Sequence, residues 1–362
     1  MELTTLDYHT AGEPLRIVTG GLPEPEGDTV LEKRLHMREH MDRYRRLLML
    51  EPRGHADMYG AVLLPPVTDD GDVGVLFLHN EGYSTMCGHG IIALVTAGLE
   101  HGLFEVADPE AIRIDTPAGR VTARAHRAGE GRVEAVSFRN VPAFVLEPKV
   151  SVVVEGQSID CTVAYGGAFY AYTDAAALGL KLVPGEAAEV IRLGRLIKAE
   201  VAKRCEIAHP EGPDDLGFLY GTIFVRQGKE PGHSRNACVF AEGELDRSPT
   251  GTGASGRAAI HHAQGDIGLG QELLIESIIG SSFRVRCLEN ALVGGIPAVI
   301  TEVTGSAWMS GEHRFVLDER DPLGNGFLRR VDILVGEHAG DAGAHQGRTI
   351  GHYPNQSDVL SE

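Results

Sequence analysis

The chain has 362 residues, of which 43% are hydrophobic, and this is enough for two globular domains with proper cores. Its formal net charge of −18 argues against nucleic acid and anionic membrane surfaces as partners. The start of the chain has no basic region followed by an apolar stretch, and no apolar run approaches the roughly 18 residues that span a bilayer, so we expect a cytoplasmic protein without a signal peptide.

The first half of the chain is expected to combine strands with two helices. Residues 30–50 carry apolar and basic residues at helical spacing, which predicts an amphipathic surface helix. We interpret its arginines as a solvated face: Arg34, Arg38, Arg43 and Arg45. The apolar run at residues 73–78 is typical of a buried strand. Residues 91–99 begin apolar all round, which predicts a helix buried inside its domain.

The rest of the chain alternates strand patterns with two further helices. Strand-like segments rich in Val, Phe, Tyr and Thr occupy residues 113–116, 133–138, 150–154, 162–165, 221–226, 236–240, 283–287, 298–303 and 313–317. Residues 186–204 form an amphipathic helical pattern through Val190, Leu193, Ile197 and Val201, and residues 254–264 are expected to be the last helix.

These elements predict an α+β fold with two pseudo-symmetric, sheet-rich halves, each built around one central helix. We expect a boundary near residue 160, with residues 1–160 forming the first half and residues 161–335 the second. Residues 336–362 are rich in Gly, His, Asp and Ser without periodicity, and we interpret them as a mobile tail with no catalytic part.

Two short turns, at matching places in the two halves, indicate where the functional site lies. Cys87 precedes Gly88-His89-Gly90, and Thr250 precedes Gly251-Thr252-Gly253; each segment then leads into a predicted helix. At a helix N-terminus, unpaired N–H groups and the positive dipole end bind anions and favour a thiolate. Either turn alone is most simply an ordinary glycine-rich helix start. Their occurrence as a pair, about one domain length apart, indicates a duplicated protein with its site between the halves.

At these residues the chain resembles the proline racemase family, whose members include 4-hydroxyproline epimerase and trans-3-hydroxy-L-proline dehydratase. The resemblance covers about residues 5–330 and includes the segments at 9–14, 54–60, 80–84 and 165–171. It implies the family fold, in which two halves resembling those of diaminopimelate epimerase enclose the active site. Family racemases and epimerases carry Cys where this chain has Thr250, whereas the dehydratases carry Thr. The resemblance therefore implies the dehydratase branch.

The chemistry of this family requires a base for the α-proton and stabilisation of the carboxylate. We assign Cys87 as the catalytic base, because a thiolate at a helix N-terminus is suited to this role. Backbone amides are expected to hold the substrate carboxylate from both sides, as the family shares, and they belong to Gly88, His89, Gly251 and Thr252.

The resemblance also implies positions for the rest of the substrate. Asp246 would contact the ring nitrogen; the alternative is a capping residue or a salt bridge with Arg247. His89 would lie beside the substrate, bonding the 3-hydroxyl or the carboxylate or orienting Cys87. Three more residues match family positions that line the pocket around the pyrrolidine ring: Tyr59, Phe240 and Ser84.

Thr250 decides the reaction that we expect. An unactivated hydroxyl has too high a pKa to act on carbon, so only Cys87 is competent and racemisation lacks its second group. The carbanion would instead expel a hydroxyl from C3 as water, giving an enamine that tautomerises to Δ1-pyrroline-2-carboxylate. The group that protonates the hydroxyl is left open among Cys87, His89, Thr250 and water. The alternative functions are proline racemase or 4-hydroxyproline epimerase and a non-catalytic amino-acid-binding protein.

Cofactors are not expected. The five cysteines are odd in number and widely spread, and the sixteen histidines lack a metal-binding spacing. The glycine-rich turns match neither a Walker loop nor a Rossmann fingerprint. We therefore expect no metal and no nucleotide, and the partner to be a small amino acid substrate; assembly as a homodimer stays open.

Overall fold

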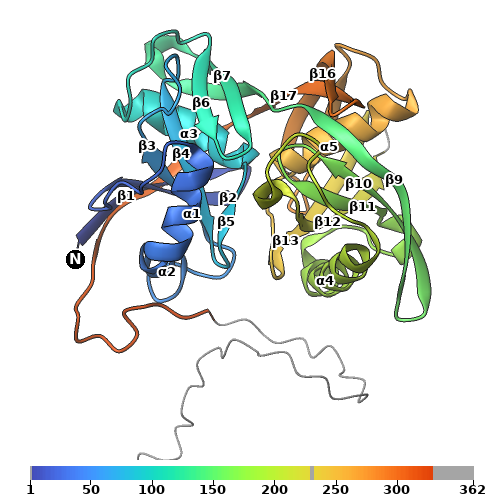
Figure 1. The fold of residues 1–362 in the computed structure, drawn as a ribbon, viewed down its shortest axis with the longest axis horizontal. Helices are drawn as coiled ribbons and strands as arrows, with labels where there is room; N and C mark the ends of the chain where they lie inside the picture. The colour runs from blue at the N-terminus through green and yellow to red at the C-terminus, as the bar shows by residue number, and fades with distance from the viewer. Residues whose placement is uncertain (1, 229–231, 329–362) are drawn as a thin grey trace, which may run out of the picture. The chain divides into compact units, whose positions relative to one another are not determined.

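The computed structural model describes residues 2–228 and 232–328, which form one compact unit (Figure 1). The interpretation of residues 336–362 as a mobile tail lies outside the described residues. The helices in these ranges are α1 (Val30–His40), α2 (Asp42–Met49), α3 (Gly88–His101), α4 (Ala187–Arg204) and α5 (Gly251–Gln264).

The strands are β1 (Glu2–Thr10), β2 (Glu13–Gly20), β3 (Tyr59–Leu64), β4 (Val73–His79), β5 (Tyr83–Ser84), β6 (Ile112–Thr116), β7 (Gly119–Arg127), β8 (Val133–Arg139), β9 (Ala143–Val154), β10 (Gln157–Tyr165), β11 (Phe169–Asp174), β12 (Leu219–Gln227), β13 (His233–Phe240), β14 (Glu244–Leu245), β15 (Glu272–Glu276), β16 (Ser282–Val293), β17 (Ile296–Gly305) and β18 (Ala307–Val316). The predicted strand segments are confirmed, and the fold is α+β.

The buried helix α3 lies among strands from both ends of the described chain. β1 pairs antiparallel with β2 and with β18, and β2 continues in parallel to β3 and then to β4. Strands β1, β2, β8 and β18 all pack against α3. Every residue of this helix from Gly88 to Gly98 is buried, which confirms the prediction of a helix inside its domain.

Helix α5 is enclosed by a second set of strands. β9, β10 and β11 pair in sequence, β11 continues in parallel to β12, and β16 and β17 form a long antiparallel pair. Strands β9, β10, β16 and β17 pack against α5, and α4 covers β12 and β13 from outside. Figure 1 shows α3 and α5 each surrounded by its own strands.

The prediction of one surface helix over residues 30–50 is wrong in two respects. The helix ends at His40 and a second begins at Asp42, with Met41 at φ −125° and ψ 11° between them. Two of the four arginines are buried rather than solvated. Arg34 donates to the carbonyl of Tyr83 at 2.8 Å, and Arg45 forms an ion pair with Asp42 and donates to the carbonyl of Asn80. Arg34 and Arg45 therefore anchor the backbone of residues 80–83, which precede Cys87 in the sequence.

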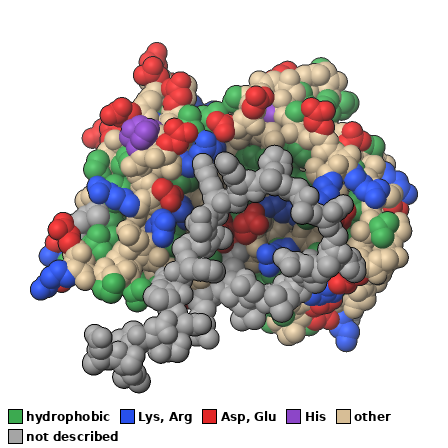
Figure 2. Space-filling model, turned by 60° about the horizontal axis from the view of Figure 1, so that its bottom comes forward, with side chains coloured by type: hydrophobic (Ala, Val, Ile, Leu, Met, Phe, Trp, Pro, Cys, Tyr) green, Lys and Arg blue, Asp and Glu red, His purple; other side chains and the backbone are tan. Residues whose placement is uncertain are grey.

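Acidic and basic side chains are interspersed over the face in Figure 2. Within the described ranges, no helix combines the length and apolar character that crossing a bilayer requires.

Candidate active site

The N-termini of α3 and α5 meet directly. A Cβ on Gly88 would lie 2.6 Å from the Cα of Gly251, and a Cβ on Gly251 would lie 2.7 Å from the Cα of Gly88. Side chains cannot be accommodated at that separation, so both positions require glycine. The glycines belong to the first turns of the helices rather than to loops before them, and this places Cys87 and Thr250 at the two N-cap positions.

A small cavity of about 20 Å³ lies at this meeting point. It brings together nine of the predicted site residues: Tyr59, Cys87, Gly88, His89, Phe240, Asp246, Thr250, Gly251 and Thr252. Ser84 does not line the cavity but accepts a hydrogen bond from the Tyr59 hydroxyl at 2.5 Å. The remaining lining residues were not predicted: Met86, Tyr170 and Tyr220. Tyr170 lies in the segment 165–171, and the resemblance of that segment to the family could have identified it as a site residue. Nothing in the sequence around Tyr220 marked that residue as part of the site.

Cys87 caps its own helix. The Sγ atom accepts a hydrogen bond from the amide of Gly90 at 3.3 Å and lies 3.2 Å from Nδ1 of His89. Burial raises the pKa of the Cys87 thiol well above its ordinary value, and the Gly90 amide only partly opposes this. The net direction is opposite to that expected from a helix N-terminus alone, because desolvation outweighs the helix dipole.

His89 is neutral in this setting. Burial lowers the pKa of its imidazole to about 3, and the hydrogen bond to the Pro14 carbonyl only partly offsets this. The side chain is therefore an uncharged neighbour of the thiol at neutral pH.

Thr250 has an unusual backbone. Its φ is 66° and its ψ is 98°, which is a strained conformation for a β-branched residue. The side chain does not cap α5. Instead, the hydroxyl donates to Oδ2 of Asp246 at 2.7 Å, so it is committed to the neighbouring carboxylate.

Asp246 is buried on the same side of the cavity. Its Oδ1 accepts the amide of Ser248 at 2.7 Å, in addition to the Thr250 hydroxyl on Oδ2. Burial raises the pKa of Asp246 to about 6, although both hydrogen bonds lower it. The predicted alternative, a bridge between Asp246 and Arg247, is not what forms: Arg247 Nη1 lies 3.4 Å from Glu13, and Nη2 lies 3.8 Å from Asp57. The carboxylate is thus available to a cationic ligand.

Glu13 is a further acidic group near the site that sequence reasoning did not single out. It lies in the segment 9–14, is fully buried, and accepts the amide of Arg247 at 2.8 Å on Oε2. Burial, together with the charge of Asp246, raises the pKa of Glu13 well above its ordinary value.

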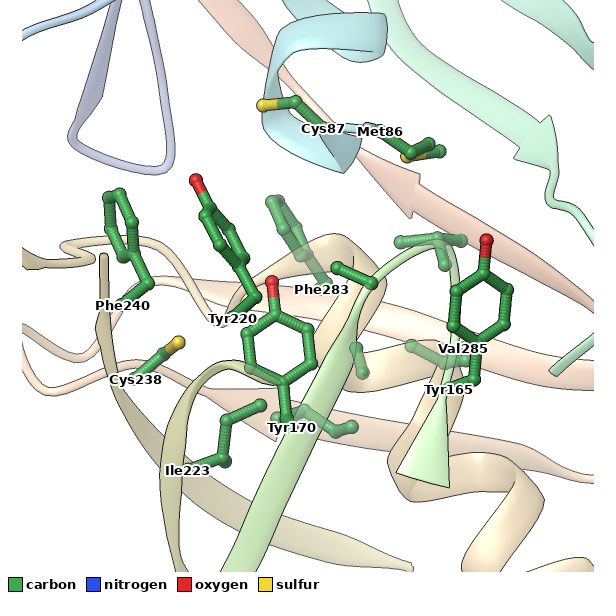
Figure 3. Close-up of a cluster of buried hydrophobic side chains, with 14 of the residues drawn as sticks. Met86, Cys87, Tyr165, Tyr170, Tyr220, Ile223, Cys238, Phe240, Phe283 and Val285 are labelled. Atoms are coloured by element: carbon green, nitrogen blue, oxygen red, sulfur yellow. The ribbon is translucent and has the colours of Figure 1, made fainter. Parts of the chain in front are cut away.

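Aromatic rings form the wall opposite the helix starts. Tyr59 and Phe240 pack edge to face with ring centroids 6.0 Å apart, and Tyr220 lies 5.4 Å from Phe240. Figure 3 shows Tyr170 and Tyr220 with their hydroxyls directed toward the end of α3 that carries Cys87. The Tyr170 hydroxyl bonds Thr252 Oγ1 at 2.8 Å. The cavity therefore has aromatic rings on one side and the polar starts of two helices on the other.

Within residues 2–228 and 232–328, no three His, Cys, Asp or Glu side chains come together as a metal site. Independence from cofactors remains a prediction that only activity measurements can test.

The chain is similar to known proteins over most of its length. The family model described as proline racemase matches residues 5–328. A trans-3-hydroxy-L-proline dehydratase of Colwellia psychrerythraea is 46% identical over 91% of this chain and 93% of its own. A 3-hydroxyproline 2-epimerase of Burkholderia multivorans is 45% identical over 91% of this chain and 98% of its own.

Among solved structures, a hydroxyproline epimerase from Agrobacterium vitis with bound trans-4-hydroxy-L-proline superposes with a TM-score of 0.84 at 34% identity. The match covers 90% of this chain and 95% of that one. With the family model spanning nearly all described residues and relatives this similar over most of their length, the chain belongs to the proline racemase family.

Proposed function

We propose that this protein is a dehydratase that converts trans-3-hydroxy-L-proline to Δ1-pyrroline-2-carboxylate and water with one base. The observation that carries the proposal is the chemical difference between the two N-cap side chains, a thiol at Cys87 and a hydroxyl at Thr250. The dehydratase name of the Colwellia psychrerythraea relative supports the same substrate class.

Substrate binding uses both helix starts. The amides of Gly88, His89, Gly251 and Thr252 would hold the carboxylate, as unpaired N–H groups at helix N-termini do. Asp246 would pair with the ring ammonium, since a carboxylate with a pKa of about 6 is ionised at neutral pH. The positive charge of the bound ammonium opposes the effect of burial on Cys87 and favours the thiolate.

Thr250 would act as a positioning residue. Its hydroxyl donates to Asp246, whose carboxylate is too weak a base to remove a hydroxyl proton for chemistry on carbon. Cys87 would therefore take the α-proton, and the electron pair left on C2 would expel the 3-hydroxyl as water. The resulting enamine tautomerises to the cyclic imine.

The second candidate is an epimerase, favoured by the name of the Burkholderia multivorans relative. Epimerisation needs an acid on the face opposite Cys87, and the nearest side chain at the matching position is the Thr250 hydroxyl, which donates to Asp246. A non-catalytic amino-acid-binding protein is a third candidate, and the buried thiol beside His89 argues against it.

Incubation with trans-3-hydroxy-L-proline separates the three candidates. The dehydratase releases the cyclic imine, an epimerase inverts C2, and a binding protein leaves the amino acid unchanged. Proline in heavy water then tests the single base: the wild-type protein should at most exchange the α-hydrogen with retention of configuration. Efficient racemisation of proline by the wild type would refute both the single-base mechanism and the dehydratase assignment.

Thr250→Cys is the matching gain-of-function variant. A second thiol at the start of α5 should allow detectable racemisation of proline or epimerisation of 4-hydroxyproline, and dehydration should fall because Asp246 loses its hydroxyl donor. Thr250→Ser keeps that hydrogen bond without a thiol and should gain neither activity, which makes it the control.

We further propose that the fold consists of two pseudo-symmetric halves. Because β9 packs against α5 and β18 against α3, we assign β1 to β8 with β18 to the first half and β9 to β17 to the second, in place of a division at residue 160. We also propose a cofactor-independent enzyme in the cytoplasm. The five cysteines are all buried and free, as suits a reducing compartment.

A further inference from the structure

The stereochemistry of the proposed substrate limits where the leaving hydroxyl can be protonated. In a trans-3-hydroxyproline, the carboxylate on C2 and the hydroxyl on C3 lie on opposite faces of the ring. The α-hydrogen, opposite the carboxylate on C2, therefore lies on the same face as the hydroxyl. A base that removes the α-hydrogen and an acid that protonates the hydroxyl must both approach that face. The acid is thus expected beside Cys87 and not at Thr250 on the other helix.

Three polar side chains near Cys87 come from the same stretch of chain as the thiol. They are His89 on α3, Tyr59 at the start of β3 and Ser84 on β5. His89 is neutral, and its ring bonds the Pro14 carbonyl. Ser84 does not line the cavity and accepts the Tyr59 hydroxyl. Of these three, Tyr59 both lines the cavity and carries an acidic O–H, which donates to Ser84 Oγ.

Two contacts fix the Tyr59 hydroxyl. It donates to Ser84 Oγ at 2.5 Å and lies 3.4 Å from the hydroxyl of Tyr220, and the residue lines the same cavity as Cys87. Its ring packs edge to face on His89, with centroids 4.8 Å apart. The phenol therefore has a proton to give, and it shares a cavity with the Cys87 thiol, from which it can recover one.

We propose that Tyr59 is the catalytic acid that protonates the departing 3-hydroxyl, a role that rests on the proposed dehydratase function. The Cys87 thiolate takes the α-proton and becomes a thiol, and the C2 electron pair forms the C2–C3 double bond as the C3–O bond breaks. Tyr59 gives its proton to that oxygen, so water leaves. The tyrosinate then takes the proton from the Cys87 thiol within the cavity that both residues line. Both groups return to their starting states: the water carries the former Tyr59 proton, and the α-proton ends on Tyr59.

This cycle suits the buried site, because it needs no proton from bulk solvent during elimination. Burial raises the pKa of Tyr59 well above its ordinary value, so the phenol stays protonated at neutral pH. Ser84 and Tyr220 offer hydrogen bonds to the transient tyrosinate, which shortens its life as an isolated charge.

The test compares two leaving groups. Dehydration of trans-3-hydroxy-L-proline requires protonation of the hydroxyl, whereas elimination of chloride from trans-3-chloro-L-proline does not. Tyr59→Phe should slow the first reaction by about 100-fold or more relative to the second, because general acid catalysis contributes roughly 10²- to 10⁴-fold. Equal losses in both reactions would overturn the proposal and leave Tyr59 a positioning residue, and unchanged dehydration would overturn it directly.

Tyr165→Phe is the matched control. Tyr165 is equally buried, does not line the cavity, and its hydroxyl has no hydrogen-bond partner among the described residues. Both reactions should proceed at the wild-type rate in this variant. Should Tyr59→Phe fail to fold, 3-fluorotyrosine at position 59 should move the alkaline limb of dehydration to lower pH without moving that of chloride elimination; an unmoved limb would overturn the proposal. Absence of dehydration by the wild type refutes the proposed function itself.

Discussion

Asp246 is a buried carboxylate. We expect it to bind the substrate ammonium and, because it is buried, to lower the free energy of unfolding. Its hydrogen bonds come from a hydroxyl and an amide, and burial raises its pKa from an ordinary value of 3.8 to about 6. A higher pKa in the folded protein means that ionisation is less favourable there than in the unfolded chain. Asp246→Asn should therefore stabilise the fold at neutral pH and abolish turnover.

The size of the effect follows from the pKa difference. Each pKa unit corresponds to about 1.4 kcal/mol, so the ionised side chain costs about 3 kcal/mol of folding free energy once both states are deprotonated. Between pH 3.8 and 6 the folded state binds more protons than the unfolded state, so the wild-type protein loses stability as the pH rises through this window. The advantage of Asp246→Asn should thus be about 3 kcal/mol at pH 7.5 and about 1 kcal/mol at pH 4.5.

Urea unfolding at these two pH values measures the difference directly. Asp7→Asn is the contrasting variant: Asp7 is also buried but is paired with Arg16 at 2.8 Å, and breaking this pair should destabilise the protein by about 3–5 kcal/mol. A stability gain for Asp246→Asn that is the same at both pH values, or a loss at pH 7.5, would show that the carboxylate is not strained by burial.

Three further outcomes are expected. Cys87→Ala should abolish dehydration while leaving the fold intact, and Cys87→Ser should be nearly as inactive because serine offers no accessible anion; substantial turnover by either would reassign the base. Exhaustive treatment with a chelator should leave activity intact, and a loss restored by one particular ion would disprove cofactor independence. Gly251→Ala should lose activity and about 1–3 kcal/mol of stability because its Cβ would meet the Gly88 backbone at 2.7 Å, whereas Gly185→Ala, with no atom within 4 Å, should change neither.

The hydrophobic pattern of the sequence was sufficient to predict the helices and strands that are apolar on every side. The strand at residues 73–78 and the helix after Cys87 were predicted because full burial leaves continuous apolar runs. The same reasoning failed for Arg34 and Arg45. Besides the nearby Asp42 that pairs with Arg45, their partners are the main-chain carbonyls of Tyr83 and Asn80, tens of residues away, and a backbone acceptor has no sequence signature.

The parts of the site that lie in the two matching turns could be predicted from the sequence. The parts that depend on how distant segments pack together could not. The paired turns marked the helix starts and, with the family resemblance, led to nine of the cavity residues. Burial reversed the expected shift of Cys87, because the cost of desolvation depends on neighbours from the whole fold. Tyr220 was missed for the same reason: an aromatic residue in a strand pattern is ordinary core until a thiol from another part of the chain lies opposite it.

The two N-cap positions match in sequence but differ in how they use their side chains. Cys87 has an extended backbone and turns its sulfur to the Gly90 amide of its own helix, whereas Thr250, at a positive φ, turns its hydroxyl away from α5 to Asp246. A hydroxyl adds no charge there, so Asp246 can remain ionised for the ring ammonium at neutral pH. A thiolate at position 250 would place a second anion against a carboxylate whose pKa is already about 6 and raise it further. A hydroxyl at position 250 therefore cannot act as an acid or base on carbon, but it allows the carboxylate that binds the ammonium to stay ionised.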